Sequence, residues 1–317
     1  VEPDIRGVTE APFRTIMGPL ITLWIVWGST YTGIALMVRS MPPLLGSGTR
    51  FIAASLLLGT IVLLVKGPRA FTVTASQIRG AMFMGVTILG VAIGIVTLAV
   101  RYVPTGIAAL IASVLPLWII LFRLRAGDRP SRLTLIGVGV GLIGLFLILI
   151  PGGTVPISGA SNTQVALWSV AIACGSFCWA FFSWRSTSYQ QPKNPLTTAV
   201  IQLASAGVFL TLVGVLIGET WNFGIITQQS WAGWAFLVFA SSAAYGAYVW
   251  LINNAPMSLV TTHAYVNPMV AVTLGFLILK EPISLDVVVG LSIVVGGVAL
   301  VVNGERRTRQ LLVEPPQ

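Results

Sequence analysis

Long apolar segments recur along this chain, and they constrain its fold more than any other feature. A helix needs about 20 largely apolar residues to cross about 30 Å of hydrocarbon. Backbone amides in lipid must also be satisfied within their own segment. We therefore predict an all-α integral membrane protein with ten transmembrane helices, at residues 19–39, 44–65, 80–99, 104–122, 133–151, 164–184, 196–217, 231–251, 258–279 and 285–303.

Charged residues are scarce and lie between the apolar segments. They make up 9% of the 317 residues, whereas a water-facing surface usually carries roughly 25%. The net charge of +9 does not indicate a nucleic-acid partner, because the basic residues lie in short loops. The chain's main partner is therefore expected to be the lipid bilayer. The connections are too short for a soluble domain or a nucleotide-binding domain.

The distribution of Lys and Arg predicts the orientation. With a cytoplasmic N-terminus, fourteen of the 18 basic residues fall in cytoplasmic segments and three in external ones. Cytoplasmic loops normally hold this excess. We therefore expect two cytoplasmic tails, at residues 1–18 and 304–317, and an even number of spans.

Two proline pairs indicate an internal repeat. Pro104 and Pro116 are twelve residues apart, as are Pro256 and Pro268. Further matches follow at an offset of 152 or 153 residues, namely Pro130 with Pro282, Gly137 with Gly290 and Gly144 with Gly297. The alternative is chance, because membrane helices are rich in both residue types. A repeat of five spans must enter the membrane inverted, so we expect two inverted five-helix repeats, 19–151 and 164–303. Secondary transporters are built this way, with the substrate near the midplane.

Three short motifs add a family resemblance. They are W-G-S-T-Y at Trp27–Tyr31, R-F-I-A-A at Arg50–Ala54 and L-K-E-P-I-S at Leu279–Ser284. With these motifs in this order, and the proline spacing of the fourth and ninth spans, the chain resembles the drug/metabolite transporter superfamily, specifically proteins with two EamA-type five-helix repeats. The first half departs from the pattern, because it reads R-A-G-D-R-P and places Asp128 near the position that matches Glu281.

The resemblance implies both an architecture and an activity. Spans 1–4 and 6–9 would surround a central cavity, with spans 5 and 10 to one side. It implies alternating access and the export of small metabolites, as in bacterial amino-acid and metabolite exporters. The location implied is the bacterial cytoplasmic (inner) membrane. The family does not determine the solute, because a fold does not determine function.

The ninth span carries the leading candidates for a substrate site. His263 is the single histidine, and Asn267 lies four residues further on the same helical face. The positions 152 residues earlier hold Ile111 and Leu115. Since the other repeat uses apolar residues there, we interpret the polar pair as a binding site. The alternative is a hydrogen bond that joins two helices.

Further candidates could form the walls of a cavity for a small organic solute. These candidates carry aromatic rings or hydroxyl groups. The alternative is that they pack against neighbouring helices or lipid. The candidates are Tyr245 and Tyr248 in the eighth span, Ser176 and Trp179 in the sixth, and Trp27, Thr30 and Tyr31 in the first. Pro116 and Pro268 are predicted to hinge their helices, since proline removes a backbone hydrogen bond. Arg50 is expected to extend to the outer interface.

The residue types that are absent from the predicted spans restrict the chemical class of the solute. All nine acidic residues lie in loops, tails or helix ends, which disfavours proton or sodium coupling through a buried carboxylate. Sugar phosphates would need several deep cations. A neutral or zwitterionic solute remains, and we favour aromatic or hydrophobic amino acids; the alternative is a broader exporter of hydrophobic compounds.

The sequence gives little support for an enzyme. A membrane-embedded enzyme is a remote alternative, because one histidine without a nearby carboxylate offers no catalytic group. Cys174 and Cys178 are expected to pack as small apolar residues, so neither a metal nor a cofactor is expected. Monomer and homodimer both remain open.

Overall fold

The computed structural model describes residues 13–127, 130–149, 160–255, 257–260, 262–281 and 285–313, and all regular elements in these ranges are helical. Six described helices are long and apolar enough to span a membrane: Arg14–Met37, Pro43–Lys66, Ala75–Ala99, Asn162–Trp184, Pro195–Leu216 and Gln228–Asn254. The prediction of an all-helical chain rich in membrane-spanning helices is confirmed to this extent.

Most helices coincide with the predicted apolar segments. They are α1 (Phe13–Met37), α2 (Pro43–Lys66), α3 (Ala75–Met84), which continues through the π-helical η2 (Gly85–Val91) into α4 (Ala92–Ala99), α7 (Arg132–Leu149), α8 (Asn162–Trp184), α9 (Pro195–Leu216), α10 (Gln228–Asn254) and α13 (Leu285–Val313). Short 3₁₀ turns η1 (Pro68–Phe71), η3 (Ser186–Ser188) and η4 (Phe223–Ile225) lie in connections. Helices α1 and α13 extend into the segments expected to be tails.

The fourth and ninth segments are interrupted. The fourth divides into α5 (Thr105–Ala112) and α6 (Leu115–Arg125), and the ninth into α11 (Met257–Val260), α12 (His263–Leu274) and the π-helical η5 (Gly275–Leu279). Pro116 has no N–H to donate to the carbonyl of Ala112, and the Ser176 hydroxyl donates to that carbonyl instead, at 3.0 Å. A side chain of another helix thus satisfies the backbone at this interruption.

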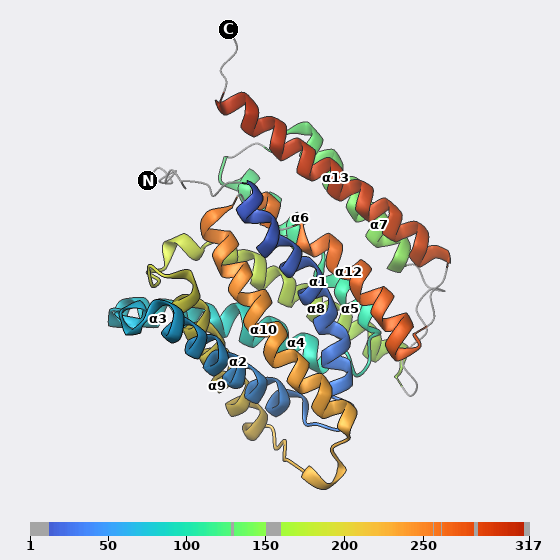
Figure 1. Cartoon of the computed structure of the whole chain (residues 1–317). Helices are drawn as coiled ribbons and strands as arrows, with labels where there is room; N and C mark the ends of the chain where they lie inside the picture. The colour runs from blue at the N-terminus through green and yellow to red at the C-terminus, as the bar shows by residue number, and fades with distance from the viewer. Residues whose placement is uncertain are drawn as a thin grey trace.

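Helices α7 and α13 lie side by side, to one side of the other helices (Figure 1). Four glycines of the sequence repeat bring them close together. A Cβ on Gly137 would lie 2.7 Å from the carbonyl oxygen of Gly297, and one on Gly144 would lie 2.8 Å from that of Gly290. These glycines are therefore required for close backbone packing.

Two carboxylates cap the N-termini of helices, one at α2 and the other at α5. Glu219 accepts hydrogen bonds from the backbone N–H groups of Leu44 and Leu45 at the start of α2, at 3.1 and 2.8 Å. Glu281 accepts from the backbone and hydroxyl groups of Thr105 at the start of α5, at 3.2 and 2.8 Å. Negative charge at a helix N-terminus is stabilising. These acidic groups therefore have structural partners.

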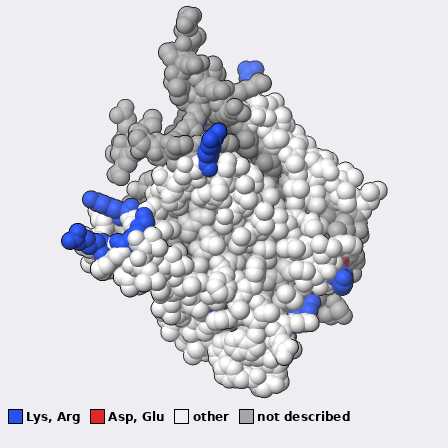
Figure 2. Space-filling model, in the orientation of Figure 1, with Lys and Arg blue, Asp and Glu red and all other residues white. Residues whose placement is uncertain are grey.

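The surface suits a lipid environment. Figure 2 shows a face that is almost entirely uncharged, with Lys and Arg at its margins, several of them where α2 leads into α3. Large apolar side chains point outward, among them Leu64, Leu216 and Leu285, which are 80%, 83% and 77% exposed. Such exposure is costly in water and favourable in hydrocarbon.

Candidate functional site: two adjoining cavities

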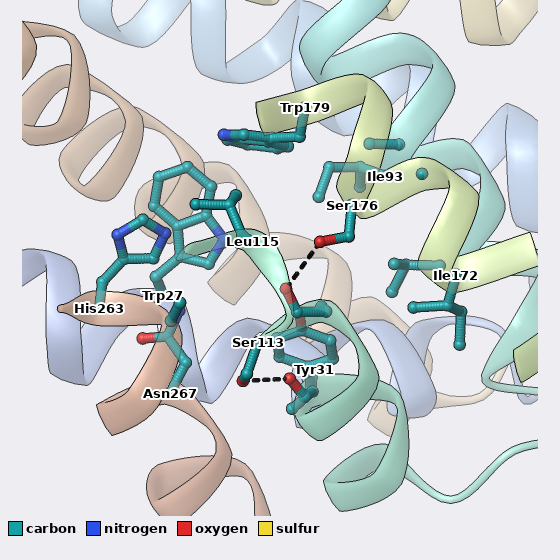
Figure 3. Close-up of a pocket in the computed structure, with 16 residues that line it drawn as sticks. Trp27, Tyr31, Ile93, Ser113, Leu115, Ile172, Ser176, Trp179, His263 and Asn267 are labelled. Carbon is teal, nitrogen blue, oxygen red and sulfur yellow. Dashed lines mark hydrogen bonds between the residues drawn. The ribbon is translucent and has the colours of Figure 1, made fainter. Parts of the chain in front are cut away.

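A cavity, called here the main cavity, lies between α1, α4, α5, α8 and α12, beside the start of α6 (Figure 3). About 520 Å³ of space free of protein atoms lies within its walls, part of it open to the surroundings. Helical spacing explains its lining. Trp27 and Tyr31 are one turn apart on α1. On α8, the lining positions Ile172, Gly175, Ser176 and Trp179 follow the spacing of one helical face.

His263 and Asn267 form part of the α12 side of the main cavity, and each carries a hydrogen-bond acceptor. His263 Nδ1 lies 2.7 Å from the carbonyl oxygen of Val260. Since two acceptors do not bond, Nδ1 carries the proton, and Nε2 of the neutral ring is an acceptor. One turn further, Asn267 Oδ1 is buried and has no partner among the described residues. A buried polar atom without a partner is costly, so Asn267 Oδ1 would gain from a solute that donates an N–H or O–H bond. His263 Nε2 is a second acceptor for the same kind of solute.

Trp27 is the centre of an aromatic cluster. Its ring centroid lies 5.2 Å from that of Trp179 and 5.3 Å from that of Tyr248, both edge-on. It stacks on His263 at 5.5 Å, and Tyr245 lies edge-on at 6.1 Å. The rings give this side of the cavity an apolar wall with electron-rich faces.

Hydrogen bonds fix the two tyrosines of α10. Tyr248 Oη accepts from Trp179 Nε1 at 2.9 Å and lies 2.8 Å from Ser183 Oγ. Tyr245 Oη donates to Gln202 Oε1 at 2.7 Å. The phenol groups are therefore occupied within the protein, and the rings remain as walls.

A second cavity adjoins the main cavity. Trp27 and Ile93 line both of them. Thr30 and Tyr245 line the second cavity, together with Arg50 of α2 and Ser241 of α10. About 330 Å³ of space free of protein atoms lies beside these residues, part of it open to the surroundings.

The expectation that Arg50 extends to the interface is wrong. Its side chain is 2% exposed. Nη1 donates to Ser241 Oγ at 2.8 Å, and Cζ lies 4.1 Å from the ring centroid of Phe51. Packing of α2 against α10 encloses the guanidinium inside the bundle, where it meets Ser241.

The structure brings most of the predicted site residues together. Trp27, Tyr31, Ser176, Trp179, His263 and Asn267 line the main cavity. Thr30 and Tyr245 line the second, and Tyr248 contacts Trp27 and His263 through its ring.

The proline positions differ between the two halves. Pro116 is the second residue of α6, which begins directly after the interruption at residues 113–114. Pro268 lies within α12, and the interruption precedes His263. Pro256, Pro282 and Asp128 lie outside the described residues. Both hinges therefore stay predictions.

Two groups of lining residues were missed. Arg50 and Ser241 form a polar contact in the second cavity, and the intramembrane position of Arg50 was the available signal. Ser113 lines the main cavity, but a serine among apolar residues offers no signal. Among the described residues there is no group of His, Cys, Asp and Glu suited to a metal ion.

One family model and several relatives match this chain over most of its length. The model of the EamA-like transporter family matches residues 17–150 and 166–303. The uncharacterized inner membrane transporter YedA of Escherichia coli K12 is 34% identical over 92% of this chain and 91% of its own length. Protein PecM of Dickeya dadantii is 25% identical over 92% of this chain and 93% of its own.

A solved crystal structure has the same fold. It matches with a TM-score of 0.71 at 17% identity and covers 93% of this chain and 99% of its own. The family model covers most of the chain in two consecutive matches, and members of this family are transporters and not enzymes. The chain belongs to the EamA-like transporter family.

Proposed function

We propose that this protein is a secondary transporter that exports small neutral or zwitterionic metabolites by alternating access, above all aromatic or hydrophobic amino acids. The observation that carries the proposal is the pairing, in one cavity, of an aromatic wall around Trp27 with the acceptors His263 and Asn267. An ammonium group can donate to both acceptors and interact with the aromatic faces. An apolar side chain gains from burial against the same rings.

Alternating access needs two halves that move against each other. The two consecutive family matches support a duplicated, ten-span architecture. Helix packing agrees, because α2 packs along α9 and α7 along α13, which pairs corresponding spans of the two halves. The interrupted segments α5–α6 and α11–α12 both line the main cavity. Interrupted helices at a substrate site are typical of secondary transporters, so these two segments are the proposed moving parts.

We propose the bacterial inner membrane as the location, with both termini cytoplasmic. The relative YedA is named an inner membrane transporter, which supports this location. The excess of Lys and Arg in the segments expected to be cytoplasmic supports the orientation. The start of α1 and the end of α13 lie toward the same end of the bundle (Figure 1), as an even number of spans requires. No nucleic-acid partner is expected.

Cysteine labelling tests this orientation. A cysteine at Ser131, in the basic connection before α7, should be protected from an impermeant thiol reagent in intact cells. A cysteine at Ser158, which lies outside the described residues, should react. Both cysteines should react after the membrane is permeabilised, which controls for access. The reverse pattern in intact cells would show that the orientation is wrong.

Counterflow tests the transport proposal. Proteoliposomes loaded with unlabelled phenylalanine should accumulate labelled phenylalanine transiently, whereas empty liposomes should not. Competition by other solutes separates the alternatives. Leucine and tryptophan should compete if amino acids are recognised, and apolar compounds without an ammonium group should compete poorly. Equal competition by such compounds would favour the broader exporter of hydrophobic compounds, and the lack of any counterflow would refute the amino-acid proposal.

A further inference from the structure

Arg50 is a buried cation that has no acidic partner in the described part of the chain. It lies in α2, seven residues after Pro43, and is 2% exposed. Its guanidinium contacts only neutral groups among the described residues: Nη1 donates to Ser241 Oγ at 2.8 Å, Nε lies 3.5 Å from Ser47 Oγ, and the Phe51 ring lies beneath Cζ. The Glu219 and Glu281 carboxylates are engaged at helix starts. Among the described residues, the positive charge therefore has no counter-ion.

Such an arrangement is costly unless an anion joins it. A buried charge is normally paired, and breaking a buried pair is strongly destabilising because one charge remains uncompensated. A guanidinium carries five N–H donors, arranged to hold a carboxylate through two of them. Ser241 and Ser47 engage two donors at most, so donors remain for a ligand in the second cavity, which Arg50 lines.

The matching position in the other half of the sequence holds a neutral residue. The position 152 residues after Arg50 is Gln202 in α9, and Pro43 and Pro195 at the starts of α2 and α9 are related by the same offset. Gln202 is buried and neutral. It donates to Gln191 Oε1 at 2.9 Å and accepts from Tyr245 Oη at 2.7 Å. At these matching positions, one half of the chain thus holds a glutamine satisfied within the protein, and the other holds a cation for which the described residues supply no counter-ion.

We propose that Arg50 binds the carboxylate group of the transported solute in the second cavity, beside the main cavity. The inference rests on the proposed function and adds a requirement to it: the solute carries one negatively charged group. Trp27 and Ile93 line both cavities, so a solute that passes Trp27 reaches the guanidinium. A free inorganic anion such as chloride shares the chemistry, and the test below separates the two.

Binding to the purified full-length protein in lipid nanodiscs tests the inference. The probes are phenylalanine, phenethylamine, which lacks the carboxylate, and 3-phenylpropanoate, which lacks the ammonium group. Wild type should bind both carboxylates, and phenylalanine more tightly than phenethylamine. In R50Q the affinity for both carboxylates should fall at least tenfold, as expected for hydrogen bonds to a charged group, while that for phenethylamine stays within about twofold. R50K should keep part of the preference for carboxylate-bearing probes over phenethylamine. R101Q changes an exposed arginine and should behave as wild type.

A second variant keeps Arg50 and so avoids a folding defect. S241D places a carboxylate where the serine oxygen now lies 2.8 Å from Nη1. It should retain thermal stability and abolish the preference for carboxylates, whereas S241N, of similar size, should keep most of it. Chloride added to wild type should compete with 3-phenylpropanoate only weakly.

The outcomes separate the inference from the proposed function. If R50Q and S241D bind both carboxylates as wild type does, or wild type binds neither, the inference is overturned. If chloride alone stabilises wild type but not R50Q, and the phenylalanine preference survives in R50Q, the site belongs to an inorganic anion and the inference is also overturned. If 3-phenylpropanoate binding depends on Arg50 but the ammonium group adds no affinity, the carboxylate site stands and the amino-acid proposal fails.

Discussion

Replacing Trp27 with alanine is expected to weaken phenylalanine binding by roughly 30-fold. The indole contacts the rings of Trp179, Tyr248 and His263 and lines both cavities. A desolvated cation–π contact contributes about 2 kcal/mol or more, which corresponds to roughly 30-fold in affinity. Calorimetry or counterflow competition with the purified transporter measures the change.

Loss of the ring also removes packing, so stability must be measured alongside binding. A buried Trp→Ala change costs about 3–5 kcal/mol of folding stability, and the melting temperature should fall. W27F retains an aromatic face and should recover most of the affinity. W231A is the matched control, because Trp231 is 41% exposed, and it should leave the affinity unchanged. If W27A and W27F melt at lower temperature but bind phenylalanine as wild type does, Trp27 is a packing residue.

The helices could be predicted from the sequence because lipid allows few alternatives. Apolar length alone located α2, α8 and α9 to within two residues at each end. The interruption between α5 and α6 was harder to predict. Pro116 indicated a bend, but the position at residues 113–114 depends on Ser176 of another helix, which donates to Ala112. A partner 64 residues away leaves no local pattern.

Candidate lining residues could be predicted where a polar or aromatic residue stood out in an apolar helix. His263, Asn267 and Trp179 stood out in this way, and the structure places all three around the main cavity. The same reasoning located Arg50 but misjudged its environment. Depth along α2 is readable from the sequence, whereas the direction of the side chain depends on which face α10 covers. That packing is a tertiary property, and only the structure shows that Ser241 meets the guanidinium.

Replacing His263 is the second change expected to weaken phenylalanine binding strongly. Two substitutions separate the hydrogen-bonding role of the ring from its packing role. H263F keeps a flat ring against Trp27 but removes both nitrogens. Since Nε2 is the proposed acceptor for the solute's ammonium group, phenylalanine affinity should fall by about 1.5–3 kcal/mol, roughly 10-fold to 100-fold. H263Q keeps a donor and an acceptor but cannot titrate, and its affinity should lie between those of H263F and wild type.

The pH dependence of transport distinguishes binding from coupling at His263. The chain holds a single histidine, and imidazole is the side chain that normally titrates near neutral pH. If His263 carries a proton during transport, H263Q should lose the pH dependence of counterflow between about pH 6 and 8. If it only accepts a hydrogen bond, H263Q should change affinity and leave the pH profile intact. Unchanged affinity and an unchanged profile, with only a lower melting temperature, would leave His263 as a residue whose bond to Val260 and stacking on Trp27 serve packing alone.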